Sequence, residues 1–220
     1  TLAHAFFEAI GRGMDAEKAK LLVMEAFERI QDVPQWQLRF KLDEFSALLD
    51  RAREWACQSE VNQELVGVEI PVGVHVGEGV RIGGYMDRLL RDEEGNYLVV
   101  DLKTGKNQPA KKEAEDHVQL MTYQLALAHG AFDGHQVHDG EGMPRQGGVL
   151  VYPGATTKKI GEIWQSDKSP EALEEFAALL PPLVEEMRGP RITARTNKDC
   201  DKCPIRSICP VQEEGRMTTD

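Results

Sequence analysis

The chain has 220 residues, and its 37 acidic and 26 basic side chains give a formal net charge of -11. A protein that binds a polyanion over its whole surface normally carries the opposite charge. Hydrophobic residues make up 41% of the chain, which is enough for one sizeable core and argues against extensive disorder. Apolar runs are far shorter than the ~20 residues of a membrane span, and a secretory leader pattern is absent at the N-terminal residues. We therefore expect a cytoplasmic protein without a membrane partner.

The first part of the chain has helical periodicity. Apolar residues recur at helical spacing over residues 2–31, and because Gly11 and Gly13 interrupt them, the pattern predicts two helices. The same spacing predicts a third helix over residues 42–61, with Cys57 near its end.

After the third helix the pattern changes to short segments rich in Val and Ile, separated by glycine-containing turns. Strands are predicted over residues 65–76, 80–91, 97–103, 147–152 and 159–164. Helices are predicted over residues 113–130 and 170–187, and a polar loop over residues 130–147. This order predicts a single α/β domain with a mixed sheet. It divides into a helical part (1–64), a core (65–187) and a basic, cysteine-bearing tail (188–220).

Charged residues interrupt two neighbouring predicted strands. Asp87 lies in the second strand, and Asp101 and Lys103 lie in the third. Residues i and i+2 of a strand share a face, so Asp101 and Lys103 project together while Leu102 enters the core. If the strands pair, Asp87 approaches the same face, and two carboxylates suit Mg²⁺ or Mn²⁺ while a lysine serves an attacking water. The alternative is a solvated salt bridge, which is common at strand ends.

Four further residues extend this pattern: His4, Glu69, Gln119 and Tyr123. In this order the motifs resemble the RecB-type branch of the PD-(D/E)XK nuclease superfamily, which includes the nuclease domains of RecB and AddB and CRISPR-associated nucleases. The resemblance runs from His4 to Cys209 and lies in the order of the motifs. It implies a restriction-endonuclease-like α/β core, with a mixed central sheet flanked by helices and a cysteine-rich, cluster-binding tail.

The resemblance also implies a role for the charged residues. His4, Asp87 and Asp101 would ligate Mg²⁺ or Mn²⁺, the carbonyl of Leu102 would be a further ligand, and Lys103 would serve the water. Without the resemblance, an ordinary helix histidine is the favoured interpretation of His4.

Gln119 and Tyr123 match the Gln-x-x-x-Tyr motif of the family, which helps to position the DNA backbone and the catalytic lysine or metal site. Glu69 falls where some members carry a strand glutamate near the metal. Outside the family context, Gln119 and Tyr123 are also consistent with a helix face that carries a hydrogen-bonding aromatic ring. The remaining histidines match no motif position and are expected on the surface or in loops: His75, His117, His129, His135 and His138.

Three cysteines lie close together, at Cys200, Cys203 and Cys209, whereas Cys57 lies far upstream. This spacing favours a metal or cluster site over a disulfide framework. It resembles the C-terminal ligands of the [4Fe-4S] cluster in iron-staple members of the family. In those members the fourth cysteine usually precedes the motif histidine, whereas Cys57 follows His4. Either Cys57 is a repositioned ligand, or the partner lies upstream of this sequence and Cys57 is a buried helix residue. Zinc is the competing metal.

The sequence therefore predicts a Mg²⁺- or Mn²⁺-dependent, exonuclease-like enzyme that hydrolyses DNA at ends or in single strands, in recombination, repair or CRISPR adaptation. Helicase or CRISPR integrase subunits are the expected protein partners. The alternative is a non-catalytic iron-sulfur or zinc DNA-binding module that acts as a scaffold in such an assembly. Basic residues gather in segments 101–112 and 188–206, so phosphate contacts are expected to be local, salt-sensitive and of modest affinity.

Overall fold

The computed structural model describes residues 1–77, 79–108, 110–129, 131–132, 135–136, 143–155, 159–190 and 194–213. The chain divides into two compact units, Thr1–Ala178 and Leu179–Asp220. The boundary lies within helix α6 (Pro170–Arg188). The first unit holds the sheet and the helices that cover it, and the second holds the cysteine-bearing tail.

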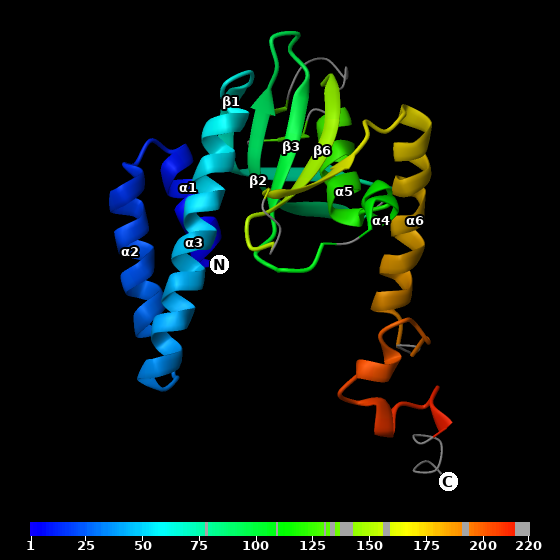
Figure 1. Cartoon of the computed structure of the whole chain (residues 1–220). Coiled ribbons are helices and arrows are strands. Elements are labelled where there is room, and N and C mark those ends of the chain that lie inside the picture. The colour runs from blue at the N-terminus through cyan, green and yellow to red at the C-terminus, as the bar shows by residue number, and fades with distance from the viewer. Residues whose placement is uncertain are drawn as a thin grey trace. The chain divides into compact units, whose positions relative to one another are not determined.

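The first unit is built on a mixed seven-stranded sheet in the order β5-β4-β1-β2-β3-β6-β7 (Figure 1). Its longer strands are β1 (Glu64–His75), β2 (Arg81–Arg91), β3 (Tyr97–Leu102), β6 (Arg145–Tyr152) and β7 (Gly161–Gln165). Strands β1, β2 and β3 form an antiparallel meander, β6 runs parallel to β3, and β7 is antiparallel to β6. Two short strands extend the β1 edge, β4 (Ala131–Phe132) and β5 (His135–Gln136). The predicted mixed sheet is confirmed.

Helices cover the two faces of the sheet and make two separate cores. The first core joins one face of β2, β3 and β6 to three helices, α1 (Leu2–Gly11), α2 (Ala16–Arg29) and α3 (Gln35–Ser59). The second core joins the other face to α4 (Lys111–Glu115) and α5 (Val118–Ala128). The alternation of side chains along β3 explains this division, because Val100 and Leu102 enter the first core and Val99 enters the second.

Two helix boundaries differ from those predicted. Helix α3 begins at Gln35, directly after Pro34, rather than at residue 42. Its first turns carry exposed aromatic residues, so they lack the one-sided apolar pattern on which the prediction depended. The helix predicted over residues 113–130 is divided into α4 and α5. The buried side-chain amide of Gln165 donates to the backbone carbonyls of Ala114 and His117. These tertiary hydrogen bonds stabilise the break between the two helices.

The predicted loop over residues 130–147 contains β4, β5 and the beginning of β6. Residues 130, 133–134 and 137–142 of it, including His138, lie outside the described residues. In the second unit, two short 3₁₀ turns, η1 (Cys200–Lys202) and η2 (Arg206–Ile208), follow α6. Within the described ranges, the helices are too short or too polar to cross a membrane.

Candidate active site

Helix α1 brings His4 to the end of strand β3. Ala3, Phe6 and Phe7 are buried and fix the apolar face of α1 against the sheet. His4 Nε2 lies 2.9 Å from the carbonyl oxygen of Leu102 and 3.6 Å from Asp87 Oδ2. Because a carbonyl only accepts, Nε2 is the donor in the first contact and Nδ1 accepts from the hydroxyl of Thr1. The imidazole is therefore oriented from both of its nitrogens.

A buried arginine holds α1 in this position. Arg88 of β2 is 1% exposed, and its guanidinium lies 4.7 Å from the ring centroid of Phe7 in α1. It also forms an ion pair with Glu60, which caps α3. Arg88 therefore ties two helices to the strand that carries Asp87, and it anchors the helix of His4 without itself contacting His4.

Asp87 and Asp101 lie just beyond the paired residues Arg88 and Val100, where β2 and β3 run side by side. The N–H of Leu102 donates to Asp87 Oδ2 over 2.7 Å. The adjacent Asp101 forms an ion pair of 2.6 Å with Lys103. The side chains of Asp101 and Lys103 thus meet as the strand alternation predicts, and Leu102 is buried in the opposite core.

A chain of hydrogen bonds runs from Lys103 to the backbone of β2. Lys103 Nζ donates to Gln119 Oε1 over 2.7 Å, and Gln119 Nε2 donates to the hydroxyl of Tyr123 over 2.9 Å. That hydroxyl donates in turn to the carbonyl oxygen of Tyr85 over 2.6 Å. Gln119 and Tyr123 are one turn apart on α5, so the helix presents both to the same place. The ammonium of Lys103 is held between Asp101 and this chain.

The residues His4, Asp87, Asp101, Lys103 and Gln119 form what we call the strand-end cluster. Helices on opposite faces of the sheet contribute to it, α1 through His4 and α5 through Gln119. Burial raises the pKa of Asp87 from 3.8 to about 6, the hydrogen bond from Leu102 opposes the rise, and the charge of Asp101 adds to it. Burial also raises the pKa of Tyr123 to about 12, so Tyr123 stays a neutral hydrogen-bonding group. The cluster therefore places two carboxylates close together in a site that is partly shielded from solvent.

Glu69 of β1 has a left-handed backbone, with φ of 48°. Such a conformation costs a non-glycine residue on the order of 1–3 kcal/mol. It is held by its neighbours Val68 and Ile70, which are buried and paired to β2. The charge of Glu69 is the smallest of the contributions that raise the pKa of Asp87, and a role for this glutamate at the metal stays a prediction.

His117 is a site residue that the sequence patterns missed. It caps the N-terminus of α5, and its Nδ1 is buried without a hydrogen-bond partner among the described residues. Burial lowers its pKa, and the positive charge of Lys103 lowers it further while Asp101 opposes this. His117 matches no motif and is expected on the surface or in a loop, and it lies in the short connection between α4 and α5. Its only signal in the sequence is its position two residues before Gln119.

The donor types of the strand-end cluster are those that Mg²⁺ or Mn²⁺ requires, since carboxylate and carbonyl oxygens dominate. Asp101 Oδ2 is buried, and the cation that it contacts is the ammonium of Lys103, at 2.6 Å, so a bound metal ion would share this oxygen with Lys103. Over the described ranges, however, no three His, Cys, Asp or Glu side chains are arranged as a ligand group. The donors contact one another and Lys103 instead, so the cluster has suitable chemistry without a preformed set of three side-chain ligands.

The four cysteines are free thiols. Cys57 is exposed on α3, which differs from the buried position considered as one alternative, and Cys200, Cys203 and Cys209 are half-buried in and beside η1 and η2. The N–H of Asn197 donates to Cys200 Sγ over 3.1 Å. In the described part of the tail, no three His, Cys, Asp or Glu side chains are arranged as a ligand group, so cluster binding stays a prediction.

Comparisons with known proteins extend this description. The family model of the PD-(D/E)XK nuclease superfamily matches residues 1–210. The search of curated proteins found no match. A solved structure titled "Crystal structure of SSO0001" is similar over 96% of this chain and 84% of its own, with 17% sequence identity and a TM-score of 0.45.

Proposed function

We propose, since the chain belongs to the PD-(D/E)XK nuclease superfamily, that it is a metal-dependent deoxyribonuclease acting on DNA ends or single strands. Proteins of this superfamily are in general metal-dependent nucleases. The observation that supports the proposal is the convergence of Asp87, Asp101, His4 and Lys103 where β3 ends beside the middle of β2. Phosphodiester hydrolysis needs charge stabilisation and a positioned nucleophile, and these groups are able to supply both.

Asp87, Asp101, His4 and the carbonyl of Leu102 would hold Mg²⁺ or Mn²⁺. When bound, the cation supplies Lewis-acid stabilisation of the charge that develops on the phosphate. Lys103 orients the attacking water and adds a second positive charge beside the phosphate. Asp101 and Gln119 hold its ammonium at 2.6 and 2.7 Å, so little reorganisation is needed during the reaction.

Gln119 and Tyr123 act on the reaction through Lys103. The carbonyl of Tyr85 accepts from Tyr123 and so fixes the far end of the hydrogen-bond chain to β2. Rotation of Gln119 would release the ammonium from one of its two partners. Gln119 and Tyr123 are therefore positioning residues. We expect their substitution to reduce the cleavage rate less than substitution of Lys103 does.

The test is cleavage of linear DNA with Mn²⁺ by Asp101→Ala and Lys103→Ala, with Lys18→Ala as a control. Lys18 is an exposed lysine on α2, so the control removes a charge away from the site. We expect the two site variants to lose about 100- to 10,000-fold in rate and the control to match the parent. Circular dichroism checks that each variant is folded. Unchanged cleavage by folded Asp101→Ala or Lys103→Ala would disprove the assignment.

The non-catalytic module makes a different prediction for the parent protein. An enzyme should bind DNA with Ca²⁺ and cleave it with Mg²⁺ or Mn²⁺, whereas a scaffold should bind DNA with each ion and cleave with none. We favour the enzyme, because a scaffold has no need for two carboxylates and a lysine at one strand end. The acidic net charge of -11 supports a helicase or integrase partner that strengthens DNA binding, in recombination, repair or CRISPR adaptation.

We further propose that Cys57, Cys200, Cys203 and Cys209 bind a [4Fe-4S] cluster, with zinc as the alternative. The support is the spacing of the tail thiols, and ligands of a structural metal site often come together only on binding. Protein purified without oxygen should be brown and absorb near ~400 nm with a cluster, and be colourless with zinc. Loss of iron in Cys57→Ala would identify the fourth ligand, and retained iron would point to a cysteine outside this sequence.

A further inference from the structure

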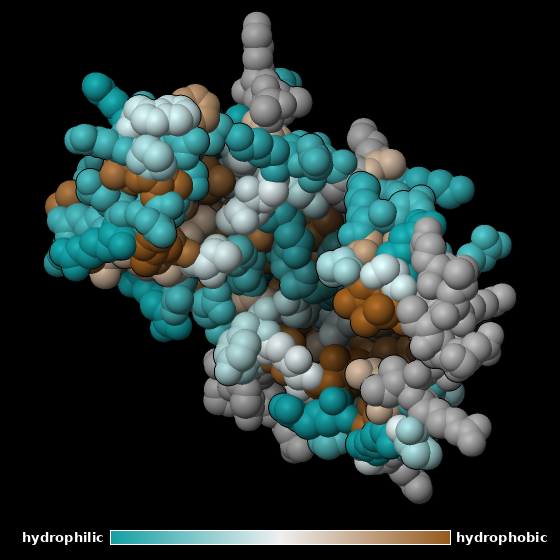
Figure 2. Space-filling model, turned by 90° about the horizontal axis from the view of Figure 1, so that it is seen from below, coloured by the Kyte–Doolittle hydropathy of each residue, from teal (hydrophilic) through white to brown (hydrophobic). Residues whose placement is uncertain are grey.

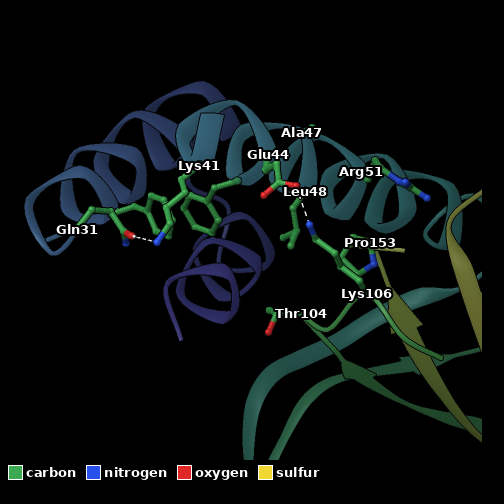
Figure 3. A pocket seen from close by; sticks show the side chains of 12 residues that line it. Gln31, Lys41, Glu44, Ala47, Leu48, Arg51, Thr104, Lys106 and Pro153 are labelled. Atoms are coloured by element: carbon green, nitrogen blue, oxygen red, sulfur yellow. Dashed lines mark hydrogen bonds and ion pairs between the residues drawn. The ribbon is translucent and has the colours of Figure 1, made fainter. Parts of the chain in front are cut away.

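A cleft lies between helix α3 and the loop that follows β3, within the first unit. Its volume is about 490 Å³, within the range of about 300–1,000 Å³ typical of small-ligand sites. Figure 3 shows Glu44 and Leu48 on α3 facing Thr104 and Lys106 on the loop. Thr104 directly follows Lys103 in the chain, so the cleft begins beside the strand-end cluster.

One wall of the cleft is apolar. Phe27 of α2 and Phe45 of α3 are stacked, with ring centroids 4.2 Å apart and an interplanar angle of 18°. Leu48 and Pro153 continue this wall. A flat apolar surface of this kind suits the face of a nucleobase, since stacking does not depend on the identity of the base.

The rim of the cleft carries positive charge. Lys41 Nζ donates to the neutral amide oxygen of Gln31 over 3.2 Å, and among the described residues this contact brings no negative charge to the lysine. Lys106 reaches across the cleft to Glu44, at 2.6 Å (Figure 3). Arg51 has a structural role instead, because it donates to two backbone carbonyls of the β6–β7 connection. A phosphate is therefore complementary to the two lysines and would compete with Glu44 for Lys106.

We propose that this cleft binds one unpaired nucleotide of the strand being cut, next to the scissile phosphate. The base lies against Phe45 and Leu48, and the phosphate lies between Lys41 and Lys106. A base in a duplex has both faces covered by its neighbours, so the cleft selects a single strand. This inference rests on the proposed nuclease function and adds the form of DNA that the site accepts.

The exposed face of α3 extends the path of the strand. Trp36 and Phe40 are 75% and 65% exposed, and with Glu44 they follow i, i+4 spacing, so they lie on the stripe that enters the cleft. Figure 2, which views the molecule from below, shows hydrophobic surface on the left, where α2 and α3 lie in Figure 1. Large exposed aromatic residues beside a cationic cleft are typical platforms for the bases of single strands.

Binding is measured first, by fluorescence anisotropy of a labelled 12-nucleotide oligothymidine with Ca²⁺ over a salt series. We expect Lys41→Ala and Lys106→Ala each to reduce the slope of log affinity against log salt by about 0.7, the value for one phosphate contact on a single strand. Trp36→Ala and Phe40→Ala should each weaken binding by about 5- to 30-fold. Lys18→Ala, which removes an exposed charge outside the cleft, should bind like the parent. Equal slopes for the two cleft lysine variants and Lys18→Ala would disprove the proposal.

The place where the strand binds is measured second, by photocrosslinking oligonucleotides that carry 5-iododeoxyuridine at successive positions. We expect one position to crosslink to the α3 peptide that contains Phe45. Crosslinks confined to other peptides would overturn the cleft as a single-strand site, and so would equal binding of a blunt duplex. In either case, cleavage of DNA by the parent protein would still support the nuclease proposal. If the parent fails to cleave with Mg²⁺ or Mn²⁺ but crosslinks at Phe45, the nuclease proposal fails and the cleft assignment stands.

Discussion

Lys103 and Lys106 lie close together in the sequence, but each forms an ion pair with a carboxylate in different surroundings. Lys103–Asp101 in the strand-end cluster and Lys106–Glu44 across the α3 cleft have the same N–O distance of 2.6 Å. The carboxylate of Asp101 is 3% exposed, whereas that of Glu44 is 42% exposed. A buried pair is held in one geometry and is costly to break, while an exposed pair is screened and exchanges partners readily. The N–O distance does not distinguish the two pairs. The burial of the carboxylate does, and it indicates that Lys103 is the lysine held in one position.

The largest effect is expected when the buried pair loses its cation. Lys103→Met leaves the Asp101 carboxylate buried without a counter-charge, and we expect the free energy of unfolding to fall by about 3–5 kcal/mol. Urea denaturation at pH 7.5 with EDTA measures this. The double variant Lys103→Met/Asp101→Asn removes both charges and should recover most of the loss. A loss below about 1 kcal/mol in Lys103→Met would show that the pair is solvated like Lys106–Glu44, and the contrast would fail.

A smaller effect concerns the second carboxylate of the cluster. The pKa of Asp87 is raised to about 6 from 3.8 by burial, so the folded protein binds this proton more tightly than the unfolded chain. The contribution of Asp87 to stability is therefore neutral below pH 3.8 and becomes unfavourable as the pH rises to 6. In EDTA, we expect the free energy of unfolding of Asp87→Asn to rise by about 2–3 kcal/mol relative to that of the parent as the pH increases from 4 to 7. A stability difference that stays constant with pH would contradict the raised pKa.

The sequence predicts the sheet well, because alternating Val and Ile residues with glycine turns specify the meander directly. The juxtaposition of Asp101 and Lys103 is predicted for the same reason, since strand geometry fixes residues i and i+2 locally. The approach of His4 to Leu102 is a tertiary contact between distant segments, and only the family resemblance indicated it.

Other features depend on tertiary structure that no local pattern encodes. The left-handed backbone of Glu69 is maintained by the pairing of its neighbours, and the division between α4 and α5 is held by the amide of Gln165. The α3 cleft joins residues from α2, α3 and three loops. The exposed Trp36 and Phe40 even obscured the start of α3, because apolar residues on a solvent face break the periodicity on which sequence analysis relies.

The smallest effect on stability is expected at the exposed pair. Glu44→Gln keeps the shape of the side chain and removes its charge, and Lys106 is 59% exposed, so the free energy of unfolding should change by less than about 1 kcal/mol. Single-strand binding should instead tighten at low salt, because Glu44 no longer competes with phosphate for Lys106, and the gain should vanish in high salt as the charges are screened. On the same preparation, urea denaturation measures the stability and fluorescence anisotropy measures the single-strand affinity. A stability loss as large as that of Lys103→Met would mean that Lys106–Glu44 holds α3 to the core, and the cleft would then be a structural junction rather than a surface that exchanges partners.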